Sequence, residues 1–398
     1  MSPNPVPLYP SSSGFTVKVL DGGLGTTLEN SLDISHTPLW SAKAVIEHPD
    51  VVLDAHLAFL RAGAQIILTS TYQCSSSTFG NAGYSDKDAR EIVSKCVHLA
   101  AEARSRFGAE RRGGIDLRAT SLAPEAPEDV KIALSLGPYG AGLSPAQEFD
   151  GHYPPPFGPR GYTPDGENCN AFPKDDEGRR KEDEATAALA RFHFERLCFL
   201  AEDEAAWDAL DFIAFETVPL VREIHAIRMA MADLGDKKSV KPKPWWISFV
   251  FPGGRFPETD GDANVPVRAV VLAAVQEDLA GSVTPLPIPS ALGINCTEVG
   301  VIPGILAEMQ DAVLAEFPVA ERRPWLVLYP NGGDVYDPIS QTWVVTETDS
   351  VWAEKLGDIV AKIRSPAESE GGRAWPGVVV GGCCRTSPED IRLLGTRL

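Results

Sequence analysis

The chain has 398 residues, of which 43% are hydrophobic and 23% charged, so it can form a large core and is not intrinsically disordered. Its 36 basic and 55 acidic residues give a net charge of −19, which disfavours nucleic-acid and anionic membrane partners. Residues 1–14 lack the features of a secretion signal, and no apolar run approaches the roughly 18 residues of a membrane-spanning helix. We therefore expect a cytoplasmic protein whose residues 1–14 form a flexible tail.

Eight short segments rich in Val, Ile, Leu and Phe recur along the chain and predict β-strands. They are residues 16–23, 64–72, 131–140, 211–219, 245–254, 290–296, 325–333 and 377–384. Each is apolar in the middle and becomes polar or glycine-rich towards its end. This pattern is typical of strands that are buried on both faces and open into a loop.

The segments between these strands have the apolar spacing of helices. They are residues 51–63, 89–108, 185–207, 220–235, 267–279, 301–317 and 349–365, and Ser387 followed by Pro388 predicts another helix start. The alternation predicts an α/β fold, a single (β/α)8 TIM barrel spanning residues 1–398. An open doubly wound sheet would more often carry a Gly-rich phosphate loop after its first strand.

Three stretches rich in Gly, Pro and charge are longer than ordinary barrel loops: residues 109–130, 141–184 and 252–266. We expect insertions rather than separate domains. The second and third follow predicted strands three and five. They therefore lie on the catalytic face, either as a lid or as mobile surface decoration.

Seven cysteines are thinly spread, which is unlike the dense, even disulfide frameworks of small secreted domains. Cys296 ends the sixth predicted strand, and Cys383 and Cys384 end the eighth, so their sulfurs are expected to meet at one face of the barrel. Adjacent residues of a regular strand point to opposite faces. The pair can bind one ion only where the backbone leaves the strand, and Gly381 and Gly382 supply that freedom.

Three thiolates without a fourth protein ligand suit a tetrahedral Zn²⁺ that keeps one position open. The alternative is that each cysteine is a small buried hydrophobe. A zinc ion with three thiolates carries a net negative charge and is a poor electrophile. It nevertheless binds an incoming thiol, promotes loss of its proton and leaves its sulfur nucleophilic. The pattern therefore predicts alkylation of a substrate thiol.

Several strings along the chain also match a known family. They are DGGLGTTLE (21–29), TSTYQ (69–73), LGPYGA (136–141), FETVP (215–219), GINC (293–296), YPNGG (329–333) and GGCCRTSPEDI (381–391). In these strings the chain resembles the homocysteine S-methyltransferases from its first predicted strand to its last. The resemblance implies one Zn²⁺ per chain, held by Cys296, Cys383 and Cys384, with homocysteine supplying the fourth sulfur.

The resemblance also suggests residues that bind the amino acid. Glu216 ends strand four and is expected to pair with the α-ammonium group, unless it is only a capping or ion-pair carboxylate. Asp21, Gly22 and Gly23 leave strand one in a turn whose amides face the polar end of the amino acid. Without the resemblance, these three residues would indicate only a tight turn.

Six further residues near strand ends are candidates for substrate contact: Ser70, Thr71, Tyr72, Tyr139, Asn295 and Asn331. The two asparagines either orient substrate or satisfy loop backbone. The hydroxyls and aromatic rings either meet a sulfonium cation, which favours π-faces, or pack in the core.

The resemblance implies direct transfer of a methyl group from a sulfonium donor to homocysteine thiolate, giving methionine. S-methylmethionine is the favoured donor and S-adenosylmethionine a second, because stand-alone relatives use them. The same site could instead use betaine as donor, or selenocysteine or another thiol as acceptor. A zinc- or thiol-binding regulatory barrel without turnover is the non-enzyme alternative. The joint presence of Asp21, Glu216 and Asn295 with the three cysteines disfavours it.

Overall fold

Eight parallel β-strands form the centre of the molecule. The computed structural model describes residues 6–10, 14–34, 39–113, 129–237, 240–277, 285–333, 335–337, 342–344, 349–365 and 372–398. The strands are β1 (Thr16–Val19), β2 (Ile66–Leu68), β3 (Lys131–Leu136), β4 (Phe212–Val218), β5 (Trp245–Phe249), β8 (Ala291–Asn295), β9 (Trp325–Tyr329) and β12 (Gly377–Val380). They pair in the order β1-β12-β9-β8-β5-β4-β3-β2. A bridge between Leu20 and Ile66 joins the two outer strands, which confirms the predicted barrel.

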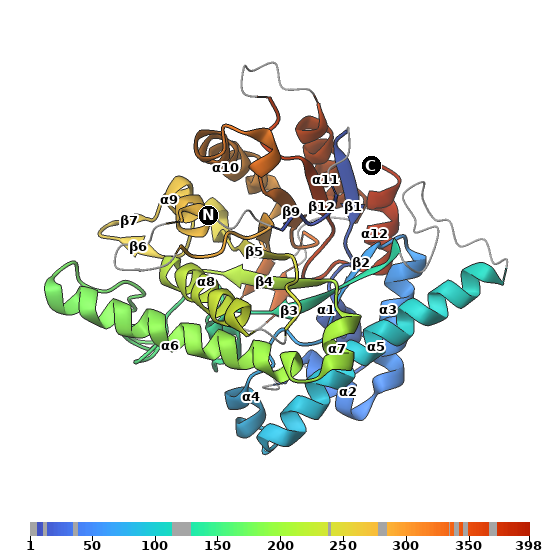
Figure 1. Ribbon diagram of the computed structural model, residues 1–398, viewed down its shortest axis with the longest axis horizontal. Coiled ribbons are helices and arrows are strands. Elements are labelled where there is room, and N and C mark those ends of the chain that lie inside the picture. The colour runs from blue at the N-terminus through green and yellow to red at the C-terminus, as the bar shows by residue number, and fades with distance from the viewer. Residues whose placement is uncertain are drawn as a thin grey trace.

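Helices surround the strands, as Figure 1 shows. The main ones are α3 (Pro49–Arg61), α5 (Asp86–Arg112), α6 (Asp176–Ala201), α8 (Val221–Asp236), α9 (Val267–Val275), α10 (Ile302–Glu316) and α11 (Asp349–Arg364). Each overlaps a predicted helix. Within the described part of the chain, no helix has both the length and the apolar character needed to span a bilayer.

Smaller elements complete the described structure. The short helices are α1 (Leu24–Glu29), α2 (Ser41–Glu47), α4 (Ser76–Asn81), α7 (Glu204–Ala209) and α12 (Pro388–Gly395). Four 3₁₀ turns lie at Tyr139–Gly142, Pro252–Gly254, Val299–Val301 and Ala320–Arg322. Two hairpins pair β6 (Thr259–Asp260) with β7 (Ala263–Asn264) and β10 (Val335–Asp337) with β11 (Thr342–Val344). Helix α12 confirms the start predicted at Ser387, whose side chain accepts a hydrogen bond from the amide of Asp390.

The prediction of one helix over 185–207 is wrong in two ways. Helix α6 begins nine residues earlier, after the N-cap Asp175, so part of the expected insertion 141–184 is helical. The helix also stops at Ala201, and Asp203 caps the separate helix α7. Both capping carboxylates accept backbone amides, a local signal that apolar spacing does not contain. Helix α5 likewise extends into the first expected insertion, of which residues 114–128 lie outside the described residues.

The amino-terminal ends of the strands are covered by residues expected to belong to a flexible tail. Leu8 is only 5% exposed, and the Tyr9 ring packs on Trp325 and Phe212 at centroid distances of 5.1 and 5.7 Å. Those two aromatic residues begin β9 and β4. The expectation of a flexible tail is therefore corrected for Leu8 and Tyr9, because apolar side chains at the barrel base gain by being covered.

The second and third expected insertions are tied to the start of α8. The hydroxyl of Tyr153 donates to Glu223 Oε2 at 2.7 Å, and Arg222 Nη1 donates to the carbonyl oxygen of Asn170 at 2.7 Å. Glu258, in the third insertion, accepts the amide of Val221. Helix α8 follows β4, so both insertions pack beside the carboxyl end of the barrel.

Candidate active site

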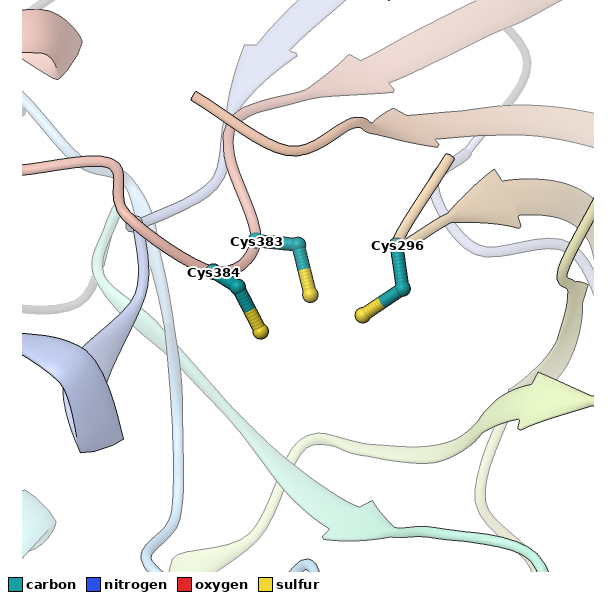
Figure 2. Close-up of side chains that lie close together, drawn as sticks. All are labelled: Cys296, Cys383 and Cys384. Carbon is teal, nitrogen blue, oxygen red and sulfur yellow. The ribbon is translucent and has the colours of Figure 1, made fainter. Parts of the chain in front are cut away.

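Three cysteine side chains meet at the carboxyl end of the barrel, as the strand assignment predicts. Cys296 follows β8, and Cys383 and Cys384 lie just beyond β12. Their Sγ atoms all lie within 4.8 Å of one another, and Figure 2 shows the sulfurs directed towards a common space. Each offers one ligand atom, so the cluster can hold one metal ion.

The backbone brings the two adjacent cysteines together by close approach and not by unusual glycine torsion angles. A Cβ atom on Gly381 would lie 2.5 Å from the carbonyl oxygen of Asp21, and one on Gly382 would lie 2.3 Å from Thr386 Oγ1. Neither glycine has a positive φ; positive φ angles occur instead at Cys296, with 47°, and at Arg385, with 62°. The expectation that these glycines supply torsional freedom is therefore corrected: they supply space.

Hydrogen bonds join the thiol loop to the first turn of the chain. The amide of Gly23 donates to Thr386 Oγ1 at 2.9 Å, and that hydroxyl donates to the carbonyl oxygen of Cys383 at 2.6 Å. The amide of Gly382 donates to the carbonyl oxygen of Asp21 at 3.0 Å. Residues from the two ends of the sequence thereby fix the position of the cysteine pair.

The three thiols do not ionise alike. Hydrogen bonds from the Cys296 and Cys384 thiols hold the pKa of Cys383 well below its usual range. The side-chain amide of Asn295 also points at Cys383 Sγ, at 3.9 Å. The hydrogen bond to Cys383 raises the pKa of Cys296. A bound cation would let all three sulfurs lose their protons, because metal ligation requires the thiolate form.

Glu216 projects from β4 beside the cysteines. Ser135 Oγ donates to its Oε2 atom, while Oε1 is buried without a hydrogen-bond partner among the described residues. Burial raises the pKa of Glu216 to about 8. The register of β4 against β5 shifts between Phe215 and Val218, where Thr217 has a φ of 59°. This irregularity sets the direction of the carboxylate.

Asn295 holds this irregular backbone. Its Oδ1 accepts the amide of Thr217 at 2.8 Å, and its Nδ2 donates to Thr217 Oγ1 at 2.7 Å. Asn295 therefore holds the irregular backbone of β4 and also faces Cys383, and its expected substrate contact stays a prediction. The carboxylate of Glu216 and the thiols are thus positioned by one amide side chain.

A cavity of about 590 Å³ opens over the cysteines, within the size range of small-molecule sites. Among the predicted site residues, Gly22, Gly23, Tyr72, Glu216, Asn295 and the three cysteines line it. Asp21, Ser70, Thr71 and Asn331 are buried nearby but do not.

The four buried residues outside the cavity wall have structural contacts. Asp21 Oδ2 accepts the amide of Leu68 at 2.9 Å and so joins the ends of β1 and β2. Thr71 Oγ1 donates to the carbonyl oxygen of Ser135 at 2.7 Å. The carbonyl oxygen of Ser70 accepts a hydrogen bond from the Cys96 thiol. The backbone amide of Asn331 donates to the carbonyl oxygen of Thr297. Their expected substrate contacts stay predictions.

Sequence reasoning missed several residues of the cavity wall, including Trp40, Ser135, Glu148 and Tyr329. Trp40 lies in an irregular segment and is held by a 2.7 Å hydrogen bond from its indole to Glu29. Glu148 lies in the second insertion. Ser135 and Tyr329 belong to predicted strands, where alternation marks inward positions but not which of them reach the cavity.

The fold and the site together define a barrel enzyme with a metal-binding thiol cluster at the mouth of a ligand-sized cavity. A sequence profile described as homocysteine S-methyltransferase matches residues 18–398. The chain therefore belongs to the homocysteine S-methyltransferase family and is an enzyme of the methyltransferase class.

Individual relatives agree over nearly the whole chain. The chain is 31% identical over 377 residues to homocysteine S-methyltransferase 3 of Arabidopsis thaliana, covering 94% of this chain and 88% of that protein. It is 30% identical over 380 residues to the selenocysteine Se-methyltransferase of Brassica oleracea var. italica, covering 96% and 88%. The metallated homocysteine methyltransferase MmuM of Escherichia coli superposes with a TM-score of 0.59 and 25% identity, covering 95% of each chain. The thiol cluster and this metallated relative together imply a bound metal.

Proposed function

We propose that the protein transfers a methyl group from a sulfonium donor to the thiol of L-homocysteine, forming methionine, with one Zn²⁺ per chain. The observation that carries this proposal is the group of three sulfurs within 4.8 Å beside an unpaired carboxylate oxygen of Glu216. Three ligands of a tetrahedral zinc at ~2.3 Å lie just under ~4 Å apart, so the cluster fits this ion. Cys296, Cys383 and Cys384 would hold it.

A zinc ion bound there supplies one open coordination position and lowers the pKa of a thiol that occupies it. The chain's own residues bind and orient the amino acid. The buried Oε1 of Glu216 gains a partner when an α-ammonium group reaches it, which favours the ionised carboxylate. Ser135 and Asn295 keep that carboxylate and the cysteines in place.

In the transfer step, a carbon–sulfur bond forms between the methyl group and the homocysteine sulfur while the donor's carbon–sulfur bond breaks. The thiol proton has already left, and the donor departs as a neutral thioether. Positive and negative charge cancel as the transition state forms, so a site shielded from water favours the reaction. S-methylmethionine is the favoured donor, because stand-alone members of the family use it, and S-adenosylmethionine is the second.

The test measures zinc per chain on protein purified under reducing conditions, followed by methionine formation from homocysteine with each sulfonium donor. Betaine as donor and selenocysteine as acceptor are run beside them, the latter because of the Brassica relative. We expect about one zinc per chain and turnover with a sulfonium donor. Bound zinc with no turnover on any pair would support the regulatory alternative instead.

Replacing Cys384 by Ser should lower both the zinc content and the activity. Loss of a residue that only hydrogen-bonds to a metal ligand typically costs roughly 10- to 100-fold, and we expect the loss of a ligand itself to reduce activity by more. Cys169→Ser is the matched control, because Cys169 is an exposed free cysteine outside the cavity wall. It should change neither quantity. Full activity of either protein without bound metal would contradict the proposed chemistry.

A further inference from the structure

A second carboxylate, on a half-buried side chain, lines the cavity, and the acceptor side of the reaction does not use it. Glu148 lies in the insertion that follows β3 and lines the same cavity as the cysteines. Its Oε2 atom is buried and has no hydrogen-bond partner among the described residues. A carboxylate oxygen in that state is costly unless a positive charge or donor reaches it.

The turn that carries Glu148 is fixed by its neighbours. The backbone amide of Gln147 donates to the carbonyl oxygen of Gly140 at 2.9 Å. The amide of Gly151 donates to the carbonyl oxygen of Gln147, also at 2.9 Å. A Cβ atom on Gly140 would lie 2.6 Å from the Gln147 carbonyl, so the two segments on either side of this turn are in close contact. The carboxylate is therefore presented to the cavity by well-supported backbone.

The position of Glu148 differs from that of Glu216. Both residues line the cavity, but Glu216 belongs to strand β4, whereas Glu148 belongs to the insertion that follows β3. The negative charge of Glu148 acts on the Cys384 thiol and on the Tyr72 hydroxyl. Both carboxylates thus interact electrostatically with the cysteine thiols, but they come from different parts of the fold.

Given the proposed function, we propose that Glu148 determines donor specificity by contacting the positive charge of the sulfonium donor. A trialkylsulfonium group has no hydrogen to donate, so a protein recognises it by charge and by aromatic faces. The ring of Tyr72, which also lines the cavity, supplies the aromatic face.

This assignment also accounts for release of the demethylated donor. Transfer converts the sulfonium cation into a neutral thioether, which lacks the transferred methyl group and no longer has a positive charge to attract the carboxylate. Burial raises the pKa of Glu148 to about 7. The carboxylate is therefore favoured in its charged form when the cation is present and less so afterwards.

The test uses Glu148→Gln, which keeps the shape of the side chain and removes its charge. With the best sulfonium donor, kcat/KM for that donor should fall about 10- to 100-fold, the loss expected for one charge-assisted contact. The KM for homocysteine and the zinc content should stay unchanged. Glu167→Gln, the same change at an exposed position of the same insertion, should behave as the unmodified protein.

A binding measurement separates this inference from the proposed function. Calorimetry compares S-methylmethionine with methionine, its neutral thioether, on zinc-loaded protein. The unmodified protein should prefer the cation, and Glu148→Gln should lose that preference, whether or not turnover is observed. An equal preference in both proteins, or a raised KM for homocysteine instead of the donor, would overturn the inference. Absence of methyl transfer with the binding preference intact would overturn only the proposed function.

Discussion

The two ends of the barrel are built from the same eight strands but from opposite kinds of residue. At the amino end, Tyr9, Phe212 and Trp325 form a cluster of aromatic rings. At the carboxyl end, Glu216 and the cysteines bury polar and ionisable groups, some without partners in the described structure. The first arrangement gains stability by burying apolar area, and the second gives some of that stability up to keep groups ready for a ligand.

Removing an aromatic ring from the amino end should produce the largest loss of stability. Trp325 is 5% exposed and packs over Gly377, where a Cβ atom would lie 2.6 Å from the ring. Trp325→Ala should lower the free energy of unfolding by about 3–5 kcal/mol, because truncating a buried aromatic residue leaves a cavity. Urea unfolding of the zinc-loaded protein measures this.

The same variant should keep its kcat at temperatures where it is fully folded, because Trp325 lies at the end of the strands away from the thiols. Zinc content provides the control. A large fall in kcat with full zinc occupancy would show that the two ends are coupled, contrary to the separation described above.

Neutralising a carboxylate at the opposite end should change the pH dependence of stability. The pKa of Glu216 is raised from 4.5 to about 8, so between these values the folded protein holds a proton that the unfolded chain has released. Its contribution to stability is therefore fully present below about pH 4.5 and is lost as the pH rises through 8. In chelator-treated protein this decline should amount to about 2–4 kcal/mol.

Glu216→Gln has no such proton to lose. The difference in unfolding free energy between this variant and the unmodified protein should consequently move in favour of the variant as the pH rises from 5 to 8.5. A constant difference across this range would contradict the assignment of a protonated Glu216 to the metal-free state. Urea titrations at four or five pH values decide between the two results.

The smallest expected effect concerns the hydroxyl of Tyr9. This oxygen is buried at the barrel base and has no hydrogen-bond partner among the described residues, and burial raises the pKa of the phenol. Tyr9→Phe should therefore leave stability unchanged or increase it by up to about 1 kcal/mol, since an unsatisfied buried group is removed. A loss of stability in thermal unfolding would indicate a partner for this hydroxyl.

The convergence of the thiols could be predicted because it depends only on strand order and direction. Once Cys296, Cys383 and Cys384 were assigned to strand ends, a parallel barrel required them to share one face. Glu216 followed by the same logic. The means of holding the cysteine pair could not be predicted, because contacts such as that between Gly381 and Asp21 depend on how two loops approach each other.

The remaining omissions lie where the sequence has no periodic pattern. Glu148 and Trp40 occupy stretches rich in turns, and neither apolar spacing nor a short motif distinguishes their position in space. The tail shows the same limit at the other end of the barrel. Leu8 and Tyr9 are two apolar residues among prolines and serines, and only the tertiary structure reveals the aromatic rings that they cover.

The hydrogen bond from Gly23 to Thr386 spans 363 positions of the chain. During synthesis, the first turn of the barrel must therefore leave the ribosome long before the residues that complete the thiol cluster. Until the last strand is made, a nascent chain can present Cys296 but neither of its two partners. Metal loading is accordingly a late event, and it reports that both ends of the polypeptide have come together.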